Sequence, residues 1–284
     1  MLVKLEEKDF GKYIDSIYEL ALDRSKSMYP IYSDGIKTKK DFVDKALKSF
    51  SVDDEEILLF VLDDIVLGWV HYYYLKDDNY FSAQTFQAQA HIDIMFKEFY
   101  EFAKQNYSGC DFYFGIPDDN ITLHQELLNH NFKISNDCYN TVCFLKDYQS
   151  QSISNSVKKI TKEEFSKFEV LHIVGHDEMY WNCERLYNHF DKWHIYIFEE
   201  DNITKGAIIF TVMTDQMAEI FCVDYLNNEF NEHIFSELVK QSLNTCKELY
   251  VHALVFFVEG FEHNSATKLG FTSLGKYLCF TKTL

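Results

Sequence analysis

Hydrophobic positions follow two different periods along this chain, and the changes of period mark the expected helices and strands. Apolar residues recur at three- and four-residue spacing in three stretches, which predicts one-faced helices over residues 3–26, 38–50 and 92–106. The period then changes, which predicts strands over residues 56–62, 65–75, 80–86, 111–116 and 138–145, with a helix after Asn120. Helices, then a meander, then strand–helix–strand–helix–strand are typical of an α/β fold around one central sheet.

The same order of elements recurs after a linker-like run at residues 149–156. Strands are expected at residues 194–198, 205–213, 218–223, 249–258 and 277–282, with a helix over 231–247. Gly68 and Gly206 begin equivalent strands, and Phe132 corresponds to Phe271. A tandem duplication explains this register better than coincidence between two ordinary α/β domains. We therefore expect two domains, at residues 1–148 and 157–284, each a mixed central sheet flanked by helices.

The composition of the chain limits which partners we expect it to bind and where in the cell we expect it. The formal net charge of −18 repels phosphate backbones, so we expect no nucleic acid and no membrane as partners. Such a surface attracts cations such as small amines or basic peptides, although a merely solubilising acidic surface is the simpler alternative. No apolar run is long enough to span a bilayer, and the first residues lack the shape of a signal peptide. The seven scattered cysteines form no Cys-x-x-Cys pair and fit reduced thiols in a cytoplasmic protein.

The strand over 80–86 runs directly into the helix that begins at Ile92. A strand, a loop and a helix N-terminus in this order bind anions, because free N–H groups and the positive end of the helix dipole meet there. The connecting residues are Gln87, Ala88, Gln89, Ala90 and His91.

This segment resembles the coenzyme-A pyrophosphate loop of the GNAT acyltransferases, in which Gln or Arg is followed after two residues by Gly, any residue, and Gly or Ala. Gln87 keeps the first position, while Ala90 and Ile92 replace the small residues. The runs 67–70 (Leu-Gly-Trp-Val) and 268–271 (Lys-Leu-Gly-Phe) also resemble family motifs. The chain is similar over nearly its whole length to a tandem GNAT protein. The resemblance implies acetyl-coenzyme A as co-substrate and an amine as acceptor.

The resemblance also implies roles for single residues. Residues 87–92 would bind the cofactor together with Asn120, which matches an Asn that contacts the pantetheine arm; a simple helix N-cap is the alternative for Asn120. Glu219 matches the family's common catalytic base, with a solvated carboxylate at a strand end as the alternative. The position where the family usually places a catalytic Tyr holds Leu127.

A further region with candidate site residues lies early in the second half of the chain, at residues 172–194. In tandem GNAT proteins it covers the substrate end of the sheet, so the resemblance implies a substrate pocket lined by Tyr180, Trp181, Glu184 and Trp193, with core packing of the aromatics as the alternative. A metal site could be drawn from His172, His176, Asp177, Glu178, Cys183, His189 and His194. A structural or substrate-facing role is the preferred interpretation, and no metal is expected.

These observations predict an acyl-coenzyme-A-dependent N-acyltransferase whose first domain holds the cofactor, because that domain keeps Gln87 and Asn120. The second half has no glycine at residues 230–235, and Glu232 would oppose a phosphate, so usual coenzyme-A binding is not expected there. The alternative is a non-catalytic GNAT-like ligand-binding or scaffold protein. An open cleft between the two central strands would favour the enzyme, and a cleft filled by side chains would favour the scaffold.

Overall fold

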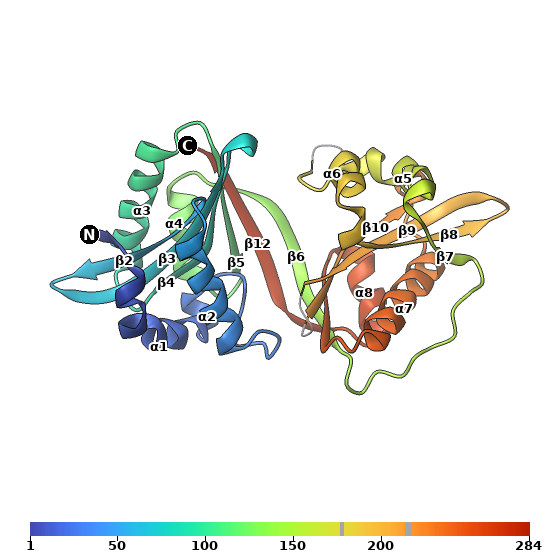
Figure 1. The fold of residues 1–284 in the computed structure, drawn as a ribbon, viewed down its shortest axis with the longest axis horizontal. Coiled ribbons are helices and arrows are strands. Elements are labelled where there is room, and N and C mark those ends of the chain that lie inside the picture. The colour runs from blue at the N-terminus through green and yellow to red at the C-terminus, as the bar shows by residue number, and fades with distance from the viewer. Residues whose placement is uncertain (177–178, 214–216) are drawn as a thin grey trace. The chain divides into compact units, whose positions relative to one another are not determined.

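A computed structural model describes residues 1–176, 179–213 and 217–284 of the chain (Figure 1). The chain forms two compact units, and each consists of one mixed sheet with helices on both faces. Unit 1 contains Met1–Cys138 together with Gly275–Leu284, and unit 2 contains Tyr139–Leu274. The α/β class and the two repeated domains expected from the sequence are confirmed.

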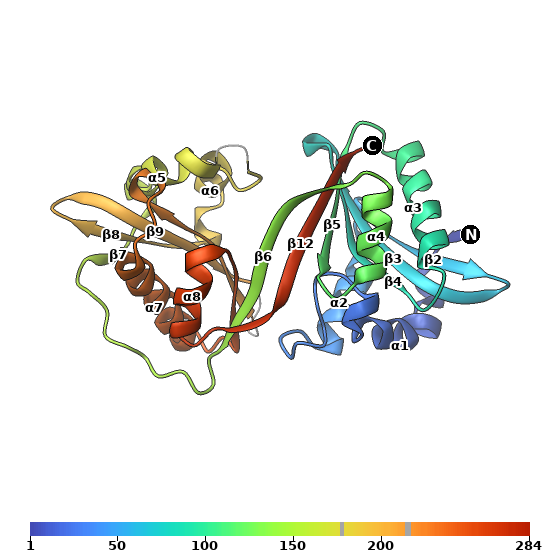
Figure 2. The same ribbon diagram turned by 180° about the vertical axis from the view of Figure 1, so that it is seen from behind.

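Unit 1 has six strands in the order β1-β2-β3-β4-β5-β12. They are β1 (Leu2–Lys4), β2 (Glu55–Leu62), β3 (Ile65–Leu75), β4 (Tyr80–Ala88), β5 (Asp111–Pro117) and β12 (Thr272–Thr283). All neighbours pair antiparallel except β4 and β5, which are parallel. Its helices are α1 (Phe10–Ala21) and α2 (Lys39–Lys48) on one face, and α3 (Ile92–Asn106) and α4 (Ile121–Asn129) on the other (Figure 2).

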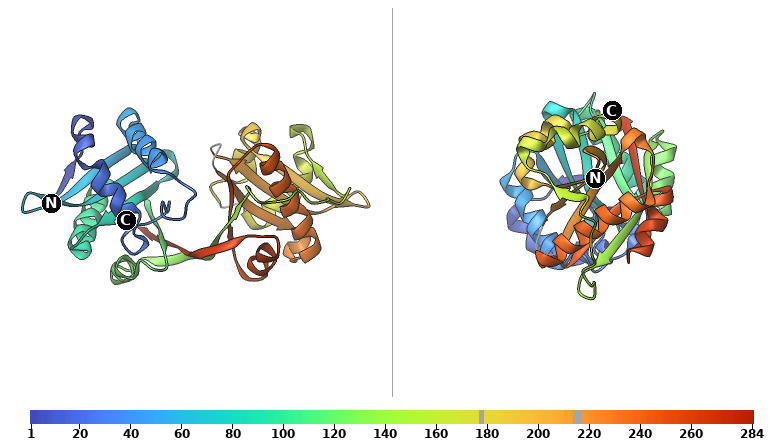
Figure 3. Two further views of the ribbon diagram at one scale, coloured as in Figure 1. Left: turned by 90° about the horizontal axis from the view of Figure 1, so that it is seen from below. Right: turned by 90° about the vertical axis from the view of Figure 1, so that its right-hand side faces the viewer.

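Unit 2 repeats this arrangement with the order β7-β8-β9-β10-β11-β6. Its strands are β7 (Val157–Lys159), β8 (His194–Glu200), β9 (Ile203–Val212), β10 (Met217–Tyr225), β11 (Ala253–Val258) and β6 (Lys133–Phe144). The parallel pair is again the fourth with the fifth, β10 with β11. Helices α5 (Ser166–His176) and α6 (Cys183–Asn188) cover one face, and α7 (Glu232–Glu248) and α8 (Gly260–Lys268) the other (Figure 3).

The last strand of each repeat is exchanged between the units. Strand β6 belongs to the first repeat, yet its residues 139–144 pair with β11 of unit 2. Strand β12 ends the second repeat, yet its residues 277–283 pair with β5 of unit 1. The compact units therefore divide after Cys138 and after Leu274. The linker-like run at 149–156 separates the repeats in the sequence, but it does not separate the compact units.

Most elements lie where the hydrophobic pattern places them, with exceptions at β1, β7 and α8. The helix over 92–106 is α3, and Thr38 starts α2 with both bonds of a capping box. The predicted start of the first helix at residue 3 is wrong. Residues Leu2–Lys4 form an edge strand beside β2, and the helix begins only at Phe10. Helix α8 was not expected. None of the described helices is long and apolar enough to cross a membrane.

Candidate functional site

The two central parallel strands of unit 1 separate partway along their length. Strand β4 pairs with β5 only from Tyr80 to Ala83, although both strands continue further. The separation begins at a β-bulge at Gln84, since His71 of β3 pairs with Thr85 whereas the next residue of β3 pairs with Ala83. A bulge bends its strand and increases the local twist. We call the diverging part of β4, residues 84–88, splay 1.

Splay 1 leads into an exposed helix N-terminus. Gln89, Ala90 and His91 are exposed, and Ile92 is half-buried. His91 adopts a left-handed conformation with a φ of 57°, and its side chain makes no capping bond to α3 in the described structure. The N–H groups of the first turn are thus not used by a capping side chain, which leaves a site suited to an anion. Asp93, in the same turn, places a negative charge against it.

Gln87 itself is buried within splay 1. Its exposed fraction is 0%, and among the described residues neither its Oε1 nor its Nε2 has a hydrogen-bond partner. A buried amide without partners destabilises a fold by about 1–3 kcal/mol. Of the predicted loop, Gln87 and Ala88 are therefore interior, and only the three residues that follow them reach the surface.

A segment of the chain itself lies along β5 beside splay 1. The Tyr29 N–H donates to the Gly115 carbonyl at 2.8 Å, and Asn120 Nδ2 donates to the Ser27 carbonyl at 2.7 Å. Met28 is fully buried in the core cluster that contains Phe86 and Phe114, the residues on the two separating strands. Residues 27–29 therefore occupy the edge of β5 that the separation would otherwise leave open.

Asn120 is the N-cap of α4 in the structure. Its Oδ1 accepts the Leu123 N–H at 3.1 Å, and its Nδ2 bonds to Ser27 as described above. Both polar atoms of the Asn120 side chain are thus hydrogen-bonded to backbone groups of the protein, which agrees with the N-cap alternative. A role of Asn120 toward a cofactor remains a prediction.

A buried polar pair that the sequence analysis did not anticipate lies beside splay 1. His71 Nε2 is 2.9 Å from Glu55 Oε2, and His71 stands opposite Thr85, the residue after the bulge. Burial lowers the pKa of His71, and the hydrogen bond from His71 lowers the pKa of Glu55. The two pKa shifts fit a neutral His71 imidazole whose Nε2–H donates to the ionised carboxylate of Glu55.

Unit 2 contains the same backbone feature. Strand β10 pairs with β11 only from Met217 to Ile220, and Phe221 forms a bulge against β9. We call residues 221–225 splay 2. The following helix differs from α3, because Asn231 Oδ1 accepts the N–H groups of His233 and Ile234, each at 3.1 Å. The N-terminus of α7 is thus occupied by a protein side chain.

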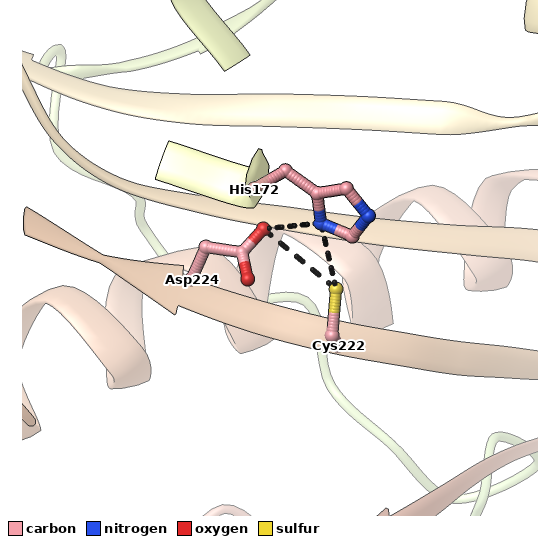
Figure 4. Close-up of side chains that lie close together, drawn as sticks. All are labelled: His172, Cys222 and Asp224. Atoms are coloured by element: carbon pink, nitrogen blue, oxygen red, sulfur yellow. Dashed lines mark hydrogen bonds and ion pairs between the residues drawn. The ribbon is translucent and has the colours of Figure 1, made fainter. Parts of the chain in front are cut away.

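Splay 2 carries a triangle of chemically active side chains (Figure 4). Cys222 and Asp224 follow the bulge on one face of β10, and Asp224 holds the position that Gln87 has in unit 1. His172 reaches them from α5, with Nδ1 at 3.0 Å from Asp224 Oδ2 and 3.8 Å from Cys222 Sγ. Cys222 Sγ lies 3.7 Å from Asp224 Oδ2. His172 and Asp224 are buried, and Cys222 is half-buried.

The other described candidates for the histidine-rich site are not members of this triangle. His189 contacts the Trp181 ring, with the ring centroids 5.9 Å apart, and His194 stacks on Phe210 at 4.9 Å. Cys183 is buried at the start of α6. Asp177, Glu178 and the side chain of His176 lie outside the described residues. Sequence reasoning thus named His172 but missed Cys222 and Asp224; the alternation of side chains along β10 was the available signal.

Three of the four residues predicted for a substrate pocket lie together. The ring centroids of Tyr180 and Trp181 are 5.2 Å apart, and those of Trp181 and Trp193 are 5.1 Å apart. Trp193 in turn contacts Phe221, the bulge residue, at 5.8 Å. Glu184 is apart from this cluster, because it is exposed on α6 and lines a groove of about 590 Å³. The aromatic cluster therefore packs beside splay 2, and Glu184 does not join it.

Glu219 lies on β10 before the bulge. It is half-buried and pairs with Thr211 of β9 and Val255 of β11. Its position in the sheet corresponds to Ser82 in unit 1. The catalytic role of Glu219 remains a prediction.

The chain matches no family model and no curated protein sequence. Solved structures are similar over its whole length. A GCN5-related N-acetyltransferase from Sphaerobacter thermophilus has a TM-score of 0.68 at 10% identity, with coverage of 99% of this chain and 95% of that one. The tandem GNAT protein from the clavulanic acid biosynthesis pathway has a TM-score of 0.60 at 9% identity, with coverage of 99% and 98%.

A third similar structure is a GCN5-related glucosamine N-acetyltransferase region of a fungal multi-domain GH3 β-N-acetylglucosaminidase. Its TM-score is 0.68 at 9% identity, and the similarity covers 99% of this chain and 38% of that one. At such identities the similarity establishes the fold. The chain has the tandem GNAT fold.

Proposed function

We propose that this protein is an acyl-coenzyme-A-dependent N-acyltransferase that transfers an acetyl group to an amine, and that unit 1 holds the cofactor. One observation carries the proposal: in unit 1, a bulged strand that separates from its parallel neighbour leads into an exposed helix N-terminus. A fold by itself does not fix a function. The proposed activity therefore depends on this loop, on the strand before it and on the groups around them.

The loop would hold the cofactor's pyrophosphate through backbone groups. The N–H groups around Ala90, His91 and Ile92 offer donors at the positive end of α3. The pantetheine arm would follow β4, and a backbone N–H near the Gln84 bulge would polarise the thioester carbonyl. Since the chain carries a formal charge of −18, these local donors must overcome an unfavourable overall field.

Acyl transfer to an amine also needs a base for the amine and an acid for the leaving thiolate. Glu219 is the base that the resemblance implies, but it belongs to unit 2 and not to the unit proposed to hold the cofactor. In unit 1 the neutral His71, held by Glu55 and opposite Thr85, is a second candidate. We assign the acceptor to the amines, because an acidic protein attracts cationic substrates.

A non-catalytic ligand-binding or scaffold protein is the second candidate. It is favoured by residues 27–29, which bond to the edge of β5 and bury Met28 beside splay 1. A pantetheine arm can enter splay 1 only if this segment moves. Acyl transfer therefore requires displacement of residues 27–29, whereas a scaffold leaves them in place.

Calorimetric titration with acetyl-coenzyme A at low and moderate salt tests the proposal. We expect micromolar binding that weakens with salt and is lost in Ile92→Asp, which places a carboxylate at the first residue of α3. Ile121→Asp is the matched control, because Ile121 is the exposed first residue of α4 in the same unit. The control should bind like the unmodified protein.

The outcome separates the two candidates. Binding followed by release of free coenzyme A in the presence of an amine panel supports the acyltransferase. Binding without turnover supports the non-catalytic ligand-binding protein. An absence of heat and of thermal shift at millimolar acetyl-coenzyme A refutes a cofactor site in unit 1.

A further inference from the structure

The triangle in splay 2 has the dimensions of a metal site. A tetrahedral zinc ion bound at about 2.0 Å to nitrogen and oxygen and about 2.3 Å to sulfur needs ligand separations of about 3.3 Å between N and O and about 3.5 Å on each edge to sulfur. The observed separations are 3.0 Å for N–O, 3.7 Å for O–S and 3.8 Å for N–S. Each edge thus agrees with the zinc geometry to about 0.3 Å.

The orientation of His172 suits a ligand. Its Nε2 lies 3.1 Å from the Trp181 carbonyl oxygen, so this nitrogen carries a proton and donates it. Metal-binding histidines are typically held in this way, with one nitrogen bonded to a carbonyl and the lone pair of the other directed at the metal. Nδ1 of His172 faces both Asp224 Oδ2 and Cys222 Sγ, as the triangle in Figure 4 shows.

Without a cation the same arrangement needs extra protons. Nδ1 and a carboxylate oxygen at 3.0 Å are both acceptors, so one proton must lie between them. The Cys222 thiol donates its proton to Asp224 Oδ2, with the sulfur and the oxygen 3.7 Å apart. A divalent metal replaces the Nδ1 proton and the thiol proton together, and the net charge of the cluster stays constant.

We propose that His172, Cys222 and Asp224 bind a divalent transition metal in unit 2. A thiolate, an imidazole and a carboxylate form a ligand set that favours zinc over magnesium or calcium. Three protein ligands are the number found in catalytic zinc sites, where the fourth position takes water or substrate. The sequence-based expectation of no metal rested on His172 with His176 and did not include the two strand residues.

Cobalt titration of the chelator-treated, reduced full-length protein tests the site, with zinc as competitor. We expect one Co²⁺ per chain, a thiolate-to-cobalt charge-transfer absorption, and displacement by Zn²⁺. Cys222→Ala should abolish the absorption and weaken binding at least about tenfold. Cys143→Ala is the matched control, since Cys143 is a buried cysteine on β6 within the same unit. This control should change neither.

A second measurement uses the unmodified protein, so it does not depend on a variant that folds. Zinc should slow alkylation of Cys222 by iodoacetamide, followed by peptide mass spectrometry, and leave Cys279 unaffected. Cys279 is the internal control, because it is half-buried like Cys222 but lies on β12. Equal alkylation of Cys222 with and without zinc, or a cobalt–thiolate absorption that persists in Cys222→Ala, would overturn the proposal.

Discussion

Splay 1 and splay 2 share one backbone design and differ in what fills it. In each unit the fourth and fifth strands run parallel for four residue pairs and then separate at a bulge, at Gln84 or at Phe221. Three residues after the bulge stands Gln87 in unit 1, whose buried amide has no partner among the described residues. The same position in unit 2 holds Asp224, which pairs with His172.

The helices that follow splay 1 and splay 2 also differ in whether their polar groups have partners. The N-terminus of α3 follows an exposed loop without a capping side chain, whereas that of α7 is capped by Asn231. In unit 2 both Asp224 and the N-terminus of α7 are bonded to protein side chains, whereas in unit 1 neither the Gln87 amide nor the N-terminus of α3 has a side-chain partner among the described residues. The same backbone design can thus carry satisfied or unsatisfied polar groups, and under the proposed function the unsatisfied groups mark the repeat that holds coenzyme A.

The largest expected effect is at Asp224. In chelator, Asp224→Ala should lower the free energy of unfolding by about 3–5 kcal/mol, because it leaves the buried His172 without its charged partner. Urea unfolding followed by circular dichroism measures the change. Asp224→Asn keeps an acceptor for Nδ1 and should cost less. A loss below about 1 kcal/mol in Asp224→Ala would contradict a stabilising interaction between His172 and Asp224.

The next largest effect on stability is expected at Gly68 and Gly206, which hold equivalent positions in the two units. A Cβ at Gly68 would lie 2.8 Å from the Gln87 carbonyl oxygen and 2.4 Å from Met95 Sδ, whereas at Gly206 it would lie 2.4 Å from Ile234 Cγ2 and 3.3 Å from the nearest backbone atom. Gly68→Ala should therefore destabilise by about 1–3 kcal/mol, and Gly206→Ala by less. Thermal unfolding of the two variants measures the difference. The reverse order would show that side chains near Gly206 yield less easily than the backbone near Gly68.

Substitution of Gln87 should stabilise the protein, in contrast to the two preceding substitutions. Replacement by methionine of similar shape removes a buried amide without partners, so Gln87→Met should stabilise the protein by about 1 kcal/mol. If the amide is kept for a ligand, the same variant should bind acetyl-coenzyme A more weakly. Denaturant unfolding and calorimetry on one preparation measure both quantities. A destabilised variant would mean that the amide is solvated or bonded in solution.

The smallest effect is on pH dependence. The pKa of His71 lies below its ordinary value, so its stabilising contribution is complete above the ordinary histidine pKa and is lost as the pH falls. The lowered pKa of Glu55 acts in the same direction at lower pH. Lys48 pairs with Glu55, and Lys45 lowers the pKa of His71 further. Unit 1 should therefore lose stability from pH 7 toward pH 4.

The variant His71→Gln checks this prediction. It removes the imidazole but keeps an amide that can donate to Glu55, so the decline in melting temperature between pH 7 and pH 5 should become shallower. An unchanged slope would assign the acid sensitivity to other groups.

The fold was largely readable from the sequence because its elements follow local rules. The apolar stripe of α3 and the capping box at Thr38 depend on neighbours within one or two turns. The exchange of β6 and β12 was not readable, because either strand has the alternation needed at either sheet edge. The choice between them depends on tertiary pairing, which no window of sequence contains.

The site was readable only in part, for a similar reason. The loop at 87–92 was found because a strand and a helix frame it. Met28 and Tyr29 belong to a segment without period, so their position along β5 could not be inferred. The link between His172 and Cys222 joins residues 50 positions apart, and the bulge at Phe221 decides which face of β10 carries Cys222 and Asp224.

The exchanged strands also constrain how the chain is made. When the ribosome has released the first 138 residues of unit 1, β5 still lacks its outer neighbour, since β12 lies at residues 272–283. Until then β5 presents a row of unpaired N–H and C=O groups, the kind of edge that recruits strands from other chains. The first repeat therefore gains the native neighbour of β5 only after the whole second repeat has been synthesised.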